Sequence, residues 1–110
     1  VNRGILTTVY LAPALGQADD FDQWTDAVAD CLAKRYADEP FVRLTGSDRL
    51  PDTKNVTGTN TIEIGWAADP RTKRLRGFSA EDNLVKGASG QAVQSFNIRF
   101  GLDETAGLPI

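Results

Sequence analysis

The residues best suited to chemistry lie near the end of the chain, in the stretch KGASGQ. Gly87 and Gly90 stand there between Lys86, a cation, and Gln91, whose amide can donate and accept hydrogen bonds. The first turns of a helix carry unpaired backbone N–H groups and a partial positive charge, and small residues let an anion or a flat ring approach them. Since a Gly-x-x-Gly spacing also permits close helix packing, the spacing alone favours packing over a ligand site.

Cysteine and histidine, the side chains most often used in catalysis and metal binding, are scarce. The chain has one cysteine and no histidine, so it forms no internal disulfide and lacks the commonest metal ligand and general base. Cys31 falls on the apolar stripe of the helical pattern FDQWTDAVADCLAKRY, where a cysteine is usually a small core residue. A reactive thiol needs a neighbouring base or cation, and the nearby sequence supplies none. We therefore predict a structural Cys31 and no metal site.

The composition is that of one small domain with a modest negative charge. The 110 residues are 41% hydrophobic and 25% charged, with a net charge of -3. Nucleic acids and anionic membranes attract clustered positive charge, and the short basic run at residues 71–76 fits a solvated hairpin arm better than a phosphate site. No apolar run is long enough to cross a bilayer, and no signal-peptide pattern opens the chain. We expect a cytoplasmic protein with no nucleic-acid or membrane partner.

Two amphipathic helices and four strands are expected from periodicity and turn residues. One helix covers residues 21–36, with Asp20 as its N-cap. The other begins near Asp82 or Asn83 and ends at Gly101, a natural helix terminator. The strands are expected at residues 5–11, 40–46, 60–68 and 74–80, the last two joined by a hairpin at residues 69–73.

This order of elements predicts an α+β domain, a mixed β-sheet with helices packed on it. Ile62, Ile64 and Trp66 alternate along the third strand, which places three apolar side chains on one face of the sheet. The long segment 47–60 is polar and rich in turn residues, with Val56 as its one strand candidate.

The last helix carries a wide apolar face, with a further apolar spot at Ile98. A domain of this size is marginally stable and leans on a partner surface, and we expect the last helix to provide that contact. The face consists of Leu84, Val85, Ala88, Ala92, Val93, Phe96 and Phe100.

The stretch DNLVKGASGQAVQSFN, followed by GL, resembles the C-terminal signature of N-acetyl-gamma-glutamyl-phosphate reductases, relatives of aspartate-semialdehyde dehydrogenase. The segments NRGILTTVYL, YADEPFVRL, LPDTKNVTGTN and GLDETAGLPI also resemble segments that follow one another in this order in that family. The resemblance covers essentially the whole chain. It departs from the usual pattern at Glu81, where an apolar residue is more usual, and at Thr59, where serine is common.

The resemblance implies an NADPH-dependent reductase that acts on an acyl phosphate in arginine biosynthesis, through a cysteine nucleophile and an assisting histidine. In the family, both residues and the Rossmann cofactor domain lie upstream of the part that resembles this chain. It therefore implies no catalytic residue here and an inactive chain by itself. Residues 1–82 would form part of the substrate and dimerisation domain, and residues 83–110 the C-terminal helix and tail that pack toward a cofactor domain absent from this chain.

Four residues are candidates for binding through this resemblance. Gln91 matches the amide that faces the cofactor NADP, and Gly87 matches the glycine that gives the cofactor room. Asn83 is a further cofactor candidate, although an N-cap role explains it equally well. Arg3 is the candidate for the carboxylate or phosphate of the substrate, with a surface ion pair as an equal alternative. The family also implies a homo-oligomer and the N-terminal cofactor domain of the same protein as partners.

Other functions stay open from the sequence. A related aspartate-semialdehyde or aminoadipyl-phosphate reductase would share these motifs. The chain would alternatively be a non-catalytic oligomerisation module, or a separate subunit that completes an active site with another chain. The broad apolar face of the last helix argues mildly against a free-standing module, because an exposed patch of that kind invites association.

Overall fold

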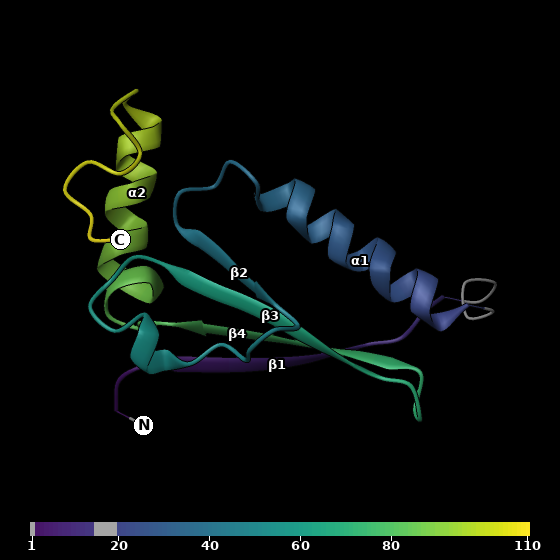
Figure 1. Cartoon of the computed structure of the whole chain (residues 1–110). Coiled ribbons are helices and arrows are strands. Elements are labelled where there is room, and N and C mark those ends of the chain that lie inside the picture. Colours follow the sequence, from purple (N-terminus) through teal and green to yellow (C-terminus); the bar gives the residue numbers. More distant parts are fainter. Residues whose placement is uncertain (1, 15–19) are drawn as a thin grey trace.

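The computed structural model describes residues 2–14 and 20–110, and these form the expected α+β arrangement (Figure 1). Strands and helices follow one another as the sequence predicts. The elements are β1 (Ile5–Leu11), α1 (Phe21–Tyr36), β2 (Val42–Gly46), the 3₁₀ turn η1 (Thr53–Asn55), β3 (Ile62–Asp69), β4 (Arg74–Glu81), the π-helical turn η2 (Val85–Ser89) and α2 (Gly90–Arg99).

The four strands form one mixed sheet in the order β1-β4-β3-β2. β4 pairs antiparallel with both β1 and β3, while β2 runs parallel to β3. The hairpin between β3 and β4 is the predicted one: the Asp69 side chain accepts hydrogen bonds from the amides of Arg71 and Thr72, and Lys73 takes a positive φ of 57°. The mixed sheet of the sequence prediction is thus confirmed.

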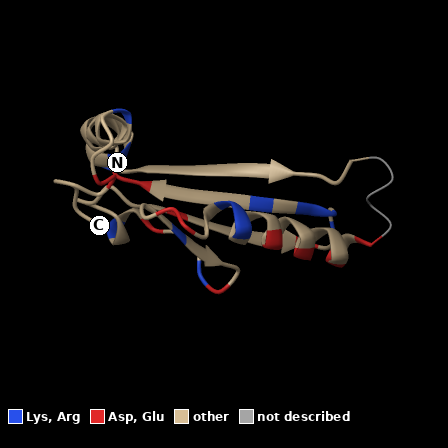
Figure 2. Cartoon of the chain, turned by 90° about the horizontal axis from the view of Figure 1, so that it is seen from above, with Lys and Arg blue, Asp and Glu red and all other residues tan. Residues whose placement is uncertain are grey.

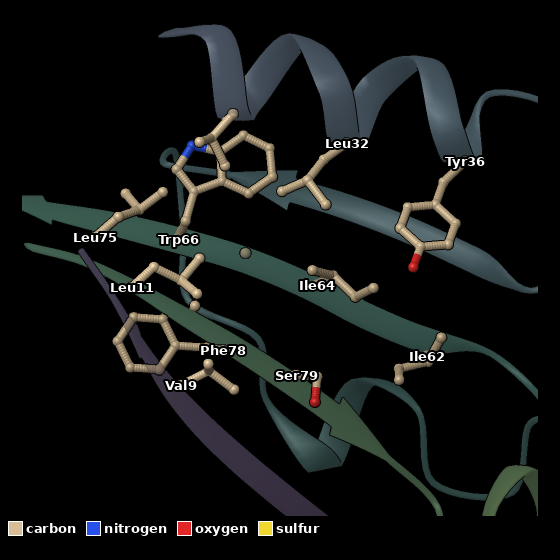
Figure 3. A pocket seen from close by; sticks show the side chains of 13 residues that line it. Val9, Leu11, Leu32, Tyr36, Ile62, Ile64, Trp66, Leu75, Phe78 and Ser79 are labelled. Carbon is tan, nitrogen blue, oxygen red and sulfur yellow. The ribbon is translucent and has the colours of Figure 1, made fainter. Parts of the chain in front are cut away.

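Helix α1 lies over one face of this sheet. Its N-terminus is capped as predicted, since the Asp20 carboxylate accepts a hydrogen bond of 3.0 Å from the amide of Gln23. Leu32 and Tyr36 point from the helix toward Ile64 on β3 (Figure 3). Between helix and sheet runs an apolar groove of about 310 Å³, whose floor includes Ile62, Ile64 and Trp66.

The prediction that Cys31 is a core residue is wrong. Cys31 is exposed, whereas its neighbour Leu32 lines the apolar groove. Successive helical residues are about 100° apart, so only one of the two can face the sheet. The longer Leu32 side chain takes the inner position.

The loop between β2 and β3 covers part of the other face of the sheet. Val56, expected as a strand residue, instead follows η1 in a turn and is completely buried, so that expectation is wrong. β2 also begins later than predicted, at Val42, because the Val42 amide still donates to the Glu39 carbonyl in a turn. The buried apolar residues are Phe21, Phe41, Val56, Leu75 and Ala80.

The last helix differs most from its prediction. Instead of one regular helix, it opens with the π-helical turn η2, in which the Gly87 amide donates to the Asp82 carbonyl at 2.9 Å, five residues back. The cap is Asp82, whose carboxylate accepts from the amides of Leu84 and Val85. The proposed N-cap role of Asn83 is therefore wrong.

Gly90 shows why a glycine stands in this helix. A Cβ atom at Gly90 would lie 2.2 Å from Asn60 Oδ1 and 2.6 Å from the Val85 carbonyl oxygen, closer than side chains tolerate. At Gly87 the nearest atom would be 3.5 Å away, an ordinary contact. Close packing therefore explains Gly90 and leaves Gly87 unexplained.

We expect Gly90→Ala to lower the free energy of unfolding by about 1–3 kcal/mol, because the new methyl group must displace Asn60 or open the π-helical turn. Gly87→Ala is the matched control and should leave stability unchanged or raise it by up to about 1 kcal/mol through better helix propensity. Urea unfolding followed by tryptophan fluorescence measures both. Equal stability of the two variants would contradict the packing explanation.

Candidate functional site

The first residues of the chain meet the start of the last helical segment at one end of the sheet. Figures 1 and 2 both place α2 at the end of the sheet where the chain begins, with the β3–β4 hairpin at the opposite end. Arg3 donates from Nε to Asp82 Oδ2 at 2.9 Å, and its Nη2 lies 2.9 Å from the same oxygen. The Asn83 side chain accepts a hydrogen bond of 2.7 Å from the Gly4 amide. Residues 3 and 4 are thus hydrogen-bonded to residues 82 and 83.

Asp82 is the centre of this cluster. Its side chain is fully buried and also accepts a 2.6 Å hydrogen bond from the Gly58 amide. Burial alone would raise the pKa of Asp82, but hydrogen bonds from Gly58, Arg3, Leu84 and Val85 outweigh burial and hold the pKa well below its usual range. The group is therefore a carboxylate at every physiological pH, and its charge is matched by Arg3.

The ion pair with Asp82 uses only some of the hydrogen-bond donors of Arg3. Its side chain is 45% exposed, and among the described residues its ion-pair partner is Asp82. A guanidinium has five N–H donors, and the pair with Asp82 uses the Nε edge. The ion pair does not use the edge that carries Nη1. The two roles predicted for Arg3, an ion pair and binding of a substrate oxyanion, are therefore compatible.

Gly87 and Gln91, the two cofactor candidates, lie on the exposed side of the same helical segment. A Cβ at Gly87 would have Glu81 and Ile5 as neighbours at 3.6 and 3.7 Å, which places Gly87 beside the ends of β4 and β1. The Gln91 amide makes one long contact within the described chain, 3.5 Å to Ser95 Oγ. Both residues are thus exposed, although the side-chain direction at Gly87 is filled by its neighbours.

Lys86 points the other way. Its ammonium donates a 2.7 Å hydrogen bond to the Gln94 side chain, which also accepts from Asn60 and donates to Glu104. Burial lowers the pKa of Lys86, while the nearby carboxylates of Glu81, Glu104 and Glu39 oppose this shift. Lys86 is thus part of an internal polar network that holds α2 to the C-terminal tail.

A second buried carboxylate, Glu63, was not singled out by the sequence. It is fully buried on β3, where Arg49 and Arg43 donate to it from both sides and the Asp52 amide adds a further hydrogen bond. The hydrogen bond from Arg49 is the main reason that the pKa of Glu63 falls to about 2. The signal was a glutamate between two strand isoleucines. Its partner Arg43 follows only from the pairing of β2 with β3, and its partner Arg49 only from the path of the loop that follows β2.

Two further features concern the described ranges 2–14 and 20–110. Within them, no three histidine, cysteine, aspartate or glutamate side chains gather as they would around a metal ion. No described helix combines the length and apolar character needed to span a bilayer.

The chain is similar to known proteins in sequence and in fold. A family model described as semialdehyde dehydrogenase, dimerisation domain, matches residues 1–83. The N-acetyl-gamma-glutamyl-phosphate reductase of Akkermansia muciniphila is 55% identical over 98% of this chain, which spans 29% of that relative. A putative LysW-aminoadipate or LysW-glutamate phosphate reductase of Pyrococcus horikoshii is 45% identical over 96% of the chain, which spans 31% of that protein.

Solved structures share the fold. One of them is an aspartate semialdehyde dehydrogenase II from Vibrio cholerae in complex with ASA, with a TM-score of 0.57 and 22% identity. The match covers 88% of this chain and 27% of that chain. The described elements are therefore a fold unit that also occurs within a much longer dehydrogenase.

We expect Glu63→Gln to lower the free energy of unfolding by about 2 kcal/mol at neutral pH, because a neutral amide leaves Arg43 and Arg49 without their anion. The folded pKa of about 2 lies below the unperturbed value of about 4.3, so the carboxylate stabilises the fold fully above the unfolded value. This stabilisation is lost as the pH falls through the folded value. Urea unfolding from neutral pH down to about pH 2 should therefore show the two proteins converging in acid.

Glu39→Gln is the matched control for this series. Glu39 forms an exposed ion pair of 3.6 Å with Arg35, so its loss should change stability by less than about 0.5 kcal/mol at any pH. A stability difference between wild type and Glu63→Gln that persists unchanged in acid would show that the charge of Glu63 is not what stabilises the sheet.

Proposed function

The chain belongs to the family of semialdehyde dehydrogenase dimerisation domains, and on that premise we propose that it is the C-terminal part of an N-acetyl-gamma-glutamyl-phosphate reductase. Such an enzyme converts N-acetyl-gamma-glutamyl phosphate to N-acetylglutamate semialdehyde with NADPH, in arginine biosynthesis in the cytoplasm. The observation that carries the proposal is the 55% identity to a reductase of this name along nearly the whole chain. The nucleophile and the acid–base group would belong to the remainder of the polypeptide.

Within this proposal, the chain's own residues bind and orient the reactants. The free edge of the Arg3 guanidinium would hold a carboxylate or phosphate oxygen of the substrate through two parallel hydrogen bonds. The exposed Gln91 amide would bind the carboxamide of the nicotinamide, and the missing side chain at Gly87 would let the ring approach. Asn83 would act by fixing the backbone at Gly4, 2.7 Å away, rather than by touching the cofactor. Bound NADPH would supply the hydride.

The outer face of α2 supports a domain arrangement in which residues 83–110 pack toward a cofactor domain. Val93, Phe96 and Phe100 are 41%, 56% and 61% exposed, and the two phenylalanine rings lie 4.7 Å apart. An apolar surface of this kind on a helix is normally covered by a partner. We propose the N-terminal cofactor domain of the same protein as that partner, with residues 1–82 as the substrate and dimerisation portion.

The edge strand β1 supports assembly into a homo-oligomer. Leu6 and Tyr10 are 62% and 64% exposed on one face of the strand, and Val9 is 49% exposed on the other. A long edge strand with apolar side chains is a template for further pairing or packing. A second copy of the protein is the partner that the family description suggests.

A related acyl-phosphate reductase is the second candidate. The 45% identity to the Pyrococcus protein, whose name refers to aminoadipate and glutamate phosphates carried on LysW, favours this alternative over a non-catalytic module. Both candidates require recognition of an oxyanion and a nicotinamide, so the residues named above would keep their roles. They differ in the acyl group that the rest of the protein must accommodate.

We expect the complete polypeptide that contains these residues to oxidise NADPH in the presence of N-acetyl-gamma-glutamyl phosphate, and residues 1–110 alone to show no turnover. The measurement is the loss of NADPH absorbance with the N-acetylglutamyl, aspartyl and aminoadipyl phosphates side by side. Preference for either of the other two substrates would select the related reductase. No turnover with any of the three would favour the oligomerisation module.

In that assay, we expect Arg3→Ala to raise the KM for the acyl phosphate by about 10- to 100-fold, the loss of a charge-assisted hydrogen bond, with the KM for NADPH unchanged. Gln91→Ala should do the reverse and raise the KM for NADPH by about 3- to 10-fold, as befits a neutral hydrogen bond. Lys34→Ala, on the exposed side of α1, is the control and should change neither. If each variant affected both reactants equally, the two roles assigned here would be wrong.

A further inference from the structure

We propose that Asp82 is a positioning residue for Arg3, which holds the guanidinium so that its outer edge is presented to an oxyanion. The inference rests on the proposed role of Arg3 in substrate binding and extends it to a residue that cannot touch the substrate, because the Asp82 side chain is fully buried. It makes the start of the last helix part of the substrate site.

The geometry favours positioning over a simple surface ion pair. Both Nε and Nη2 of Arg3 converge at 2.9 Å on a single oxygen, Oδ2 of Asp82. One edge of the guanidinium plane is therefore fixed, and since the group is rigid and planar, the opposite edge is fixed with it. An arginine held in this way loses less rotational freedom when it binds a carboxylate or phosphate than one that moves freely.

Asp82 is itself held in place from three directions. The amide of Gly58 donates to Oδ2 at 2.6 Å, and the amides of Leu84 and Val85 donate to Oδ1 at 2.8 and 3.3 Å. These donors come from the loop after η1 and from the first residues of the helical segment. The carboxylate cannot follow a mobile Arg3; instead, Arg3 must conform to the carboxylate.

The backbone is fastened beside this pair. Asn83 accepts from the Gly4 amide at 2.7 Å, so residues 3 and 4 are joined to residues 82 and 83 by a side-chain pair and by a backbone contact. The Arg3 side chain and the backbone amide that follows it are therefore both fixed. This arrangement is needed to place a charged group to within a fraction of an ångström.

The test is a double-mutant cycle on the complete protein, with Asp82→Asn, Arg3→Ala and the double variant. We expect Asp82→Asn to raise the KM for the acyl phosphate about tenfold in the wild-type background and to have no further effect once Arg3 is removed. The kcat and the KM for NADPH should change little. If Asp82 had a merely structural role, Asp82→Asn would multiply the KM for the acyl phosphate by the same factor with and without Arg3. That result would overturn the proposal.

Two further variants guard against loss of folding. Asp82→Ser retains a hydroxyl that can cap the amides of Leu84 and Val85, and it replaces Asp82→Asn in the cycle if the latter does not fold. Asp69→Asn is the matched control, because Asp69 also caps two amides, those of Arg71 and Thr72, but lies in the β3–β4 hairpin. It should leave the KM for the acyl phosphate unchanged.

A binding measurement separates this inference from the proposed function. Isothermal titration calorimetry with inorganic phosphate, and separately with N-acetylglutamate, uses the same four proteins and needs no turnover. Coupled losses of about tenfold in affinity for one probe would support the positioning role even if no acyl phosphate is reduced, and would identify which oxyanion Arg3 binds. If neither affinity depends on Arg3 and Asp82 together, the inference fails, whether or not the protein is a reductase.

Discussion

The candidate site depends on the hydrogen bonds and the ion pair formed by the buried carboxylate of Asp82. It gathers Arg3 from the start of the chain, the Gly58 amide from the long loop and the first amides of the last helical segment around one charge. A buried charge is costly unless it is fully paired, so the three segments must all be in place for the carboxylate to be tolerated. The pairing that makes the buried charge of Asp82 tolerable in the folded protein therefore also fixes the position of Arg3.

Helix α2 buries polar side chains and exposes apolar ones, the reverse of an ordinary surface helix. Toward its own chain it buries Gln94 and Asn97, which hydrogen-bond to Asn60, Glu104 and the Ala106 carbonyl, while its larger apolar side chains face outward. Polar contacts fix direction and register more sharply than they add stability. The helix is thus oriented by its own chain and left open toward whatever covers its apolar face, which suits an element that connects two parts of a larger protein.

Local patterns were sufficient for most of the fold. β1, α1 and the β3–β4 hairpin follow from alternation, from the cap at Asp20 and from turn residues, all of which act between near neighbours in sequence. The failures required distant neighbours. The inward turn of Leu32 in place of Cys31 depends on where the sheet lies, and the burial of Glu63 depends on arginines from other segments. Asp82 looked like an alternative cap, and nothing local indicated its pair with Arg3.

The sheet order also has a consequence for the synthesis of the protein. Of the four strands in this sheet, β1 is synthesised first, yet its partner is β4, and the pairing of Ile5 with Glu81 spans most of the chain. Contacts between residues so far apart form slowly, because the intervening chain must be ordered first. During that interval the apolar strand β1 has neither its hydrogen-bonding partner nor a covering layer, so the nascent chain is most prone to aggregation, and most dependent on chaperones, until β4 has emerged.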